Sequence, residues 1–179
     1  PGERNSGFKF IDQVRGGAIP KEFIPAVEAG VKEALESGVI AGYPVVDIKV
    51  SLYDGTFHEV DSSEIAFKMA GSIATKDGLS KAKPVLLEPI MKLEVVTPAA
   101  FLGDIIGDLN SKRGHVDGIE TRGDICTVRC FIPLAETFGY ATILRSLSQG
   151  RATYFMEFHR YQELPTELAT QIVTKIKGK

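Results

Sequence analysis

The second half of the sequence constrains the fold most, because its apolar residues change period in a definite order. Alternation with a period of two predicts strands at 88–96, 115–120, 125–132 and 152–160. Apolar spacings of three and four predict one helix after the first strand and another at 134–147. The order βαββαβ predicts a ferredoxin-like domain, with a four-stranded antiparallel sheet and both helices on one face. A terminal helix is predicted at 165–177.

The two helices inside this domain have an expected start and an expected buried face. Thr97 has the character of an N-cap, with Pro98 as the first helical residue. The residues expected to face the sheet are Leu102, Ile105, Ile106, Leu109, Phe138, Ala141, Leu144 and Leu147.

The first half of the sequence predicts a mixed α/β domain. Strands are expected at 7–14 and 46–52, and a helix between them has Pro25 in its first turn. Asp61 and Glu64 have the spacing of a capping box at the start of a second helix, which is expected to close at Asp77-Gly78. The apolar faces of the two helices are Ile24, Val27, Val31 and Leu35 for the first, and Ile65, Met69 and Ile73 for the second.

The clearest break in the chain is Lys81-Ala82-Lys83-Pro84, since a proline follows a helical pattern and precedes a strand pattern. We therefore expect an α+β chain of two domains, with residues 1–83 in the first and residues 84–179 in the second.

Composition limits the classes of function. The formal net charge is −2, so no overall basic field attracts nucleic acid, and any RNA contact requires a local patch or a matching shape. The longest apolar runs, such as 84–90, are too short to cross a bilayer, and the N-terminus lacks a signal-peptide pattern. Cys126 and Cys130 lie four residues apart in one strand, too far apart to bridge, and are expected to be buried thiols in a reducing compartment.

Catalytic motifs are absent from the sequence. No glycine-rich loop precedes a Lys-Ser or Lys-Thr pair, as a phosphate-binding loop requires. Asp104 and Gly107 have the Asp-x-x-Gly spacing of a GTPase switch, but their expected position in mid-helix excludes that role. The three histidines are scattered over both domains without metal-ligand spacing, and Ser62 and Ser63 near His58 are better explained as helix-capping residues.

Two loops lead into helices and carry candidate contact residues. They span 15–21 and 54–60, and free N–H groups at a helix N-terminus suit phosphate. The residues alone also allow two ordinary strand-to-helix connections, with Phe57 packed against its helix and His58 merely solvated.

Several motifs resemble the elongation factor G family. Residues 16–27 (GGAIPKEFIPAV) and 54–64 (DGTFHEVDSSE) resemble the two signatures of its domain IV. Residues 87–91 (LEPIM), 103–110 (GDIIGDLN), 133–142 (PLAETFGYAT) and 145–151 (RSLSQGR) resemble its domain V. The resemblance extends over essentially the whole chain.

The resemblance implies a fold and a function. Residues 1–83 would be most of domain IV, an α/β domain of the ribosomal protein S5 domain 2-like type, and residues 84–179 would be a ferredoxin-like domain V with its terminal helix. Domain IV enters the decoding site of the ribosome and accompanies the GTP-dependent movement of transfer RNA and messenger RNA. The residues expected at its tip, in contact with RNA or the ribosome, are Gly16, Gly17, Ala18, Ile19, Pro20, Lys21, Gly55, Thr56 and His58.

The same resemblance limits what this chain does by itself. The family binds GTP and Mg²⁺ in an N-terminal domain that is absent here, so we expect no catalytic residue, metal or cofactor in these 179 residues. The family's domain IV also begins before Pro1, so its sheet is expected to be incomplete here. The implied partners are ribosomal RNA, transfer RNA and messenger RNA, with no membrane and a monomeric state, in bacterial cytoplasm or in an organelle.

Two alternatives remain open at this stage. The first is a paralogous translational GTPase that acts in ribosome recycling or ribosomal protection. The second is a ferredoxin-like module that binds a small ligand or a partner protein, which requires a polar, shaped pocket.

Overall fold

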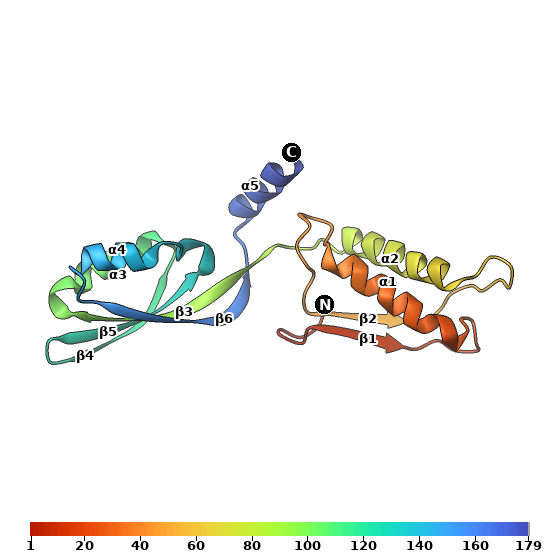
Figure 1. Cartoon of the computed structure of the whole chain (residues 1–179), viewed down its shortest axis with the longest axis horizontal. Helices are drawn as coiled ribbons and strands as arrows, with labels where there is room; N and C mark the ends of the chain where they lie inside the picture. The colour runs from red at the N-terminus through yellow and green to blue at the C-terminus, as the bar shows by residue number, and fades with distance from the viewer. Residues whose placement is uncertain (179) are drawn as a thin grey trace. The chain divides into compact units, whose positions relative to one another are not determined.

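The computed structural model describes residues 1–178 and divides them into two compact units. Unit 1 contains residues 1–85 together with the C-terminal segment from Thr166, and unit 2 contains Leu86–Pro165. The first 85 residues are coloured from red to yellow in Figure 1, and unit 2 is coloured from green to blue. Within 1–178, no helix has both the length and the apolar character needed to cross a membrane.

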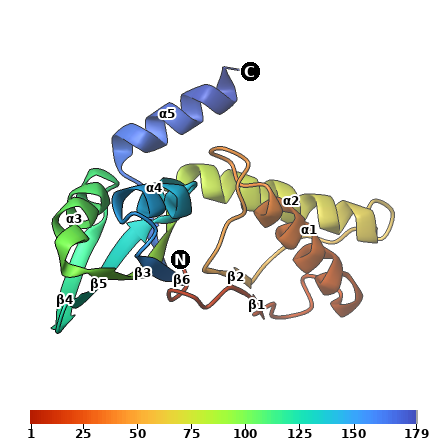
Figure 2. The same cartoon turned by 60° about the vertical axis from the view of Figure 1, so that its left-hand side comes forward.

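Unit 1 has two helices on one side of a short sheet (Figure 1). The parallel strands β1 (Phe8–Asp12) and β2 (Ile48–Leu52) pair directly, and α1 (Ile24–Glu36) connects them after a 3₁₀ turn, η1 (Lys21–Phe23). α2 (Glu64–Lys81) follows β2 and lies side by side with α1 (Figure 2). The core of unit 1 is made by Ile19, Ala26, Val27, Val31, Leu35, Phe67 and Leu79.

The contact between α1 and α2 depends on two glycines. A Cβ built on Gly30 would overlap the carbonyl oxygen of Lys68, and one on Gly71 would lie 2.7 Å from that of Val27. Any side chain at these positions would therefore push the helices apart.

The start and the apolar face of α2 differ from the sequence expectations. The N-cap is Ser63, whose Oγ accepts the N–H of Ala66 at 3.1 Å, so the predicted capping box at Asp61 is wrong. The face with Ile65, Met69 and Ile73 is exposed rather than packed against α1. The predicted end at Asp77-Gly78 is also wrong, because α2 continues to Lys81 without a positive φ at Gly78.

Unit 2 has the predicted ferredoxin-like architecture. Its sheet has the order β4-β5-β3-β6, with β3 (Leu87–Pro98), β4 (His115–Arg122), β5 (Ile125–Pro133) and β6 (Thr153–Glu163). Every pairing in this sheet is antiparallel. α3 (Leu102–Ser111) and α4 (Tyr140–Leu147) cover one face (Figure 1), and α5 (Thr166–Lys177) follows β6.

The core of unit 2 lies between this face and the helices. It contains Leu93, Val95, Ile105, Leu109, Val128, Cys130, Ile132, Tyr140 and Leu144. Cys126 and Cys130 are both buried free thiols, which confirms their expected burial.

Both helices of unit 2 start later than predicted, and this difference changes which residues form the core. Pro98 and Pro133 are each the last extended residue before a 3₁₀ turn, η2 (Ala99–Phe101) or η3 (Leu134–Glu136). Thr97 is thus a fully buried strand residue, not an N-cap. α4 begins only at Tyr140, after Gly139 at φ +77°. Phe138 is therefore 78% exposed, and Tyr140 takes the core position that was predicted for Phe138. Ala141 is likewise exposed, which corrects the expectation that it faces the sheet.

Candidate functional site

The first candidate loop is an exposed turn that requires glycine for its backbone conformation. Gly16 and Gly17 have consecutive positive φ angles of +65° and +71°, and a Cβ on either would meet open space. Conformation rather than crowding therefore selects glycine at both positions. Gly16, Gly17 and Lys21 are exposed, while Ala18 and Pro20 are half-buried.

Ile19 differs from its neighbours because its side chain turns into the protein. It is 3% exposed and belongs to the core of unit 1. A Cβ built on Gly55 would lie 2.6 Å from Ile19 Cδ1. Ile19 therefore packs directly beneath the second loop, and the structure brings the two loops together at one end of unit 1.

Aromatic packing also holds the second loop in place, in addition to the contact between Gly55 and Ile19. The ring of Phe57 lies 5.9 Å from that of Phe23 in η1, and Phe23 stacks on Phe67 of α2 at 4.8 Å. Phe57 packs on Phe23 and keeps 36% of its surface exposed. The loop is held by both η1 and α2 through this row of rings.

His58 is exposed on a backbone that is hydrogen-bonded on both sides. Its N–H donates to Ser62 Oγ at 2.9 Å, and its carbonyl accepts the N–H groups of Asp61 and Ser62 at 3.2 and 3.0 Å. The backbone that carries the ring is therefore held by a turn, while the side chain is exposed.

Two exposed apolar residues beside these loops were not singled out in the sequence. Tyr53 is 74% exposed directly after β2, and Val60 is 93% exposed in the turn after His58. Tyr53 could have been recognised from the sequence, because it is an aromatic residue on the side of the alternating strand where the other residues are polar. Val60 carried no comparable signal, because a single valine in a polar loop is common.

Charges around the two loops are mixed. Arg15 and Lys21 supply positive charge, whereas acidic side chains are contributed by Glu22, Asp54, Glu59 and Asp61. Contact with RNA here would depend on shape and hydrogen bonds more than on net attraction.

Unit 1 also contains an apolar groove of about 630 Å³. Residues from α1 and α2 line it, and so do all five residues of β2. Few polar groups face it; those that do include Thr75 and Asp54.

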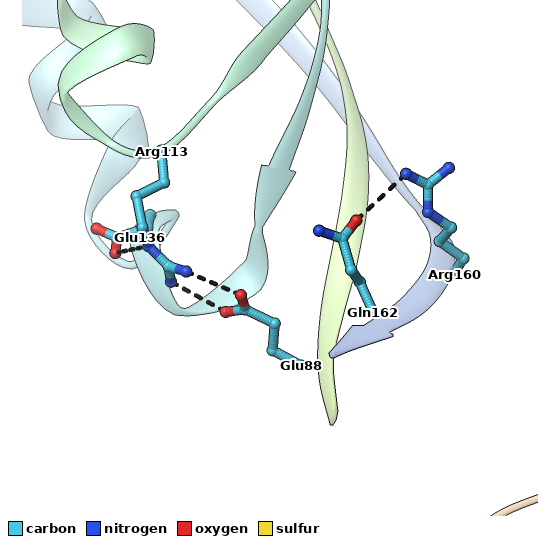
Figure 3. Close-up of polar contacts among 5 residues, drawn as sticks. All are labelled: Glu88, Arg113, Glu136, Arg160 and Gln162. Carbon is cyan, nitrogen blue, oxygen red and sulfur yellow. Dashed lines mark hydrogen bonds and ion pairs between the residues drawn. The ribbon is translucent and has the colours of Figure 1, made fainter. Parts of the chain in front are cut away.

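Unit 2 contains an ionic cluster with a structural role (Figure 3). Arg113 donates to both carboxylate oxygens of Glu88, and its Nε donates to Glu136 at 3.0 Å. Hydrogen bonding to Glu88 raises the pKa of Arg113. The cluster links the end of α3 to the start of β3 and to η3.

Among the described residues, the Asp-x-x-Gly motif and the histidines lie in separate segments of the fold. Asp104 and Gly107 lie inside α3, as the sequence predicted, and cannot form a switch loop. Within 1–178, no group of three or more His, Cys, Asp or Glu side chains could hold a metal ion. His115 and His159 lie on unit 2, where His159 stacks on Phe131.

The chain is similar in sequence to two family models and a known relative, and in structure to a solved protein. The family model described as elongation factor G, domain IV, matches residues 1–83, and the one described as elongation factor G C-terminus matches residues 85–172. Elongation factor G of Aquifex pyrophilus is 60% identical over 173 residues, which cover 97% of this chain and 25% of that protein. A crystal structure of a Thermus thermophilus protein matches with a TM-score of 0.91 and 41% identity, over 97% of this chain and 26% of that chain.

The α+β architecture and both family matches define the C-terminal domains of a translation elongation factor. The chain belongs to the elongation factor G family. It spans about a quarter of the length of the relatives that it matches.

Proposed function

We propose that this chain is the ribosome-contacting part of a translocase, and that its two adjoining loops contact RNA in the decoding site. The observation that carries the proposal is the packing of Ile19 beneath Gly55, which joins the loop at Gly16 and Gly17 to the loop that presents His58. Two loops that are distant in sequence thereby form one exposed surface, on a support fixed by Phe57 and by the turn at His58.

This surface, which we call the tip, suits RNA for reasons beyond its position. Gly16 and Gly17 have no side chains, so their backbone N–H groups can approach a phosphate or ribose closely. An exposed imidazole can both donate and accept a hydrogen bond, which suits base edges and 2′-hydroxyls. Neither feature requires a proton transfer or a bound cofactor.

The partners and chemistry of the complete protein follow from the family and are part of the proposal. The complete factor would be a GTPase, and a domain outside these residues would bind its GTP and Mg²⁺. The ribosome would be the partner, and a bacterial cytoplasm would be the location.

The apolar groove of unit 1 fits this view better than it fits a small-ligand module. Since the whole of β2 lines it and β2 pairs only with β1 within residues 1–178, the groove follows a strand with a free edge. The mostly apolar lining offers few groups that would orient a polar ligand.

The test uses the complete factor with His58→Ala and compares two rates. We expect ribosome-stimulated GTP hydrolysis to stay near the wild-type rate, while movement of transfer RNA and messenger RNA slows about ten- to hundredfold, as a lost contact of about 1.4–3 kcal/mol implies. Glu59→Ala is the control, since it changes the neighbouring exposed residue. Unchanged translocation, or a parallel fall in both rates, would contradict the proposed role of the tip.

The same pair of rates separates the paralogous functions. A recycling or protection factor would retain ribosome binding through these domains but would not accelerate translocation. Measurement of the translocation rate with the wild-type factor therefore decides between the alternatives, and subunit splitting identifies a recycling factor.

A further inference from the structure

The sequence contains three Asp-Gly pairs, and the backbone that carries them differs from one to the next. Asp54-Gly55 lies in the second loop of the tip, outside any helix or strand. Asp77-Gly78 lies inside α2, and Asp117-Gly118 lies in β4. All three aspartates are exposed, so the backbone distinguishes these sites and access to solvent does not.

An Asp-Gly pair can rearrange without an enzyme. The glycine nitrogen attacks Cγ of the preceding aspartic acid, so that an N–Cγ bond forms and the Cγ–OH bond breaks. The nitrogen's proton leaves with that hydroxyl as water, which gives a cyclic succinimide. Water then adds at the aspartate main-chain carbonyl carbon and breaks its bond to the nitrogen, so that the chain continues through Cγ as isoaspartate. Glycine favours ring closure because it has no side chain to shield the nitrogen and allows the necessary backbone rotation.

The nitrogen of Gly55 lies against the group that it would attack. Its N–H donates to Oδ1 of Asp54 at 2.8 Å, and Oδ1 is bonded directly to Cγ. Within residues 1–178, no main-chain carbonyl accepts this N–H. The reacting groups are therefore held next to one another, and no main-chain hydrogen bond has to break before they react.

Secondary structure holds the other two glycine nitrogens. Gly78 lies inside the hydrogen-bonded turns of α2, where Lys81 Nζ also lies 2.6 Å from the carboxylate of Asp77. Gly118 is paired with Arg129 across the β4–β5 ladder. Ring closure at either site requires the helix or the ladder to open locally, which limits the rate to the small population of the open state.

We propose that Asp54 is a site of spontaneous isoaspartate formation in the folded protein, and that it reacts faster than Asp77 or Asp117. The rearrangement adds a carbon atom to the main chain at a place without spare room, since a Cβ on Gly55 would lie 2.6 Å from Ile19 Cδ1. The lengthened backbone displaces the second loop from Ile19 and loosens the tip. This proposal rests on the chemistry of Asp54-Gly55 and does not depend on contact between the tip and RNA.

The experiment ages the complete factor at neutral pH and physiological temperature and follows each Asp-Gly pair separately. Peptides from successive samples are scored for isoaspartate by resistance to endoproteinase Asp-N and by methylation with protein isoaspartyl methyltransferase. A parallel sample is aged in denaturant, where all three pairs lose their structure. Asp54→Glu is the matched variant, because it keeps the carboxylate but would have to close a larger ring, which is much slower.

In the folded factor, we expect isoaspartate to form at 54 at least about tenfold faster than at 77 or 117, whereas the three rates should be comparable in denaturant. The Asp54→Glu variant should form none at 54. Equal rates in the folded factor, or a faster reaction at 77 or 117, would overturn the proposal. A residue 54 that reacts in denaturant but stays unmodified in the folded factor would also overturn it, since the loop would then protect the aspartate.

Hydrogen exchange of the amides at 56–60 tests the consequence for the tip. Ageing should speed this exchange in the wild-type factor in proportion to the isoaspartate formed at 54, and should leave it unchanged in Asp54→Glu. Unchanged exchange in wild-type protein that carries isoaspartate at 54 would refute the loosening of the tip.

Discussion

The guanidinium of Arg113 makes a bidentate contact with the carboxylate of Glu88, with N–O distances of 2.8 and 2.9 Å. Arg113 has a positive φ of +57°, so the contact also fixes an unfavourable backbone conformation at the end of α3. The Glu88 side chain is only 10% exposed, which makes loss of its partner costly.

Replacement of Arg113 by Ala should therefore destabilise unit 2, by about 1–3 kcal/mol after allowance for the partial exposure of the arginine. Hydrogen exchange of unit 2 amides measures the loss without interference from unit 1. Arg129→Ala removes an exposed ion pair and should cost clearly less. Equal losses in the two variants would show that the Glu88 contact has no special role.

Gly30 and Gly78 form a second matched pair. Gly30→Ala forces a Cβ against the Lys68 carbonyl and should destabilise unit 1 by about 1–3 kcal/mol or more. Gly78→Ala, in a helix with open space around that position, should stabilise unit 1 by about 0.5–1 kcal/mol. Hydrogen exchange of the amides in α1 and α2 measures both changes in stability. Tolerance of alanine at Gly30 would mean that the two helices do not approach this closely.

Ile19 should control the order of the tip. Ile19→Ala removes the side chain beneath Gly55 and should cost about 2–5 kcal/mol of local stability, with faster amide exchange at 54–60. Lys21→Ala, at an exposed position in the same region, should leave that exchange unchanged. Unit 2 amides provide the internal reference, and an unaltered loop in the Ile19 variant would argue against the joined tip.

Cys130 should contribute to the dependence of stability on pH. Burial raises the pKa of its thiol from an ordinary value of 9.0 to about 11, because the folded state disfavours the thiolate. The folded state thus binds more protons than the unfolded state between these values, and the contribution is complete below pH 9 and declines as the pH rises toward 11.

The measurement compares wild type with Cys130→Val between about pH 8 and pH 11, a range that spans both values of the thiol pKa. The variant should lose less stability over this range, by about 1–3 kcal/mol. Parallel curves for the two proteins would show that the thiol does not ionise on unfolding in this range.

The sheet order of unit 2 was predictable because its strands alternate cleanly and its topology has few alternatives. The helix starts were not, since proline at φ near −60° suits both the first helical residue and the last extended one. Pro20, Pro98 and Pro133 all take the extended choice, with ψ of 137°, 145° and 136°. After Pro133, α4 begins at Tyr140 instead of the predicted residue 134, and Phe138 moves from the expected core to the surface.

The tip was only partly predictable. The glycine pair and His58 could be recognised as exposed loop residues from turn chemistry and from the family resemblance. The contact that joins the loops could not, because Ile19 and Gly55 are far apart in sequence and meet only through the packing of unit 1.

Unit 2 begins and ends on neighbouring strands. Leu87 lies opposite Glu163, and the N–H of Leu164 donates to the carbonyl of Leu86 at 2.9 Å. A pulling force applied through the two ends of this unit would therefore load the β3–β6 ladder one hydrogen bond at a time, as in opening a zipper, rather than shear all its bonds together. We therefore expect low mechanical resistance along this route, with β6 separating from β3 before the helices are disturbed.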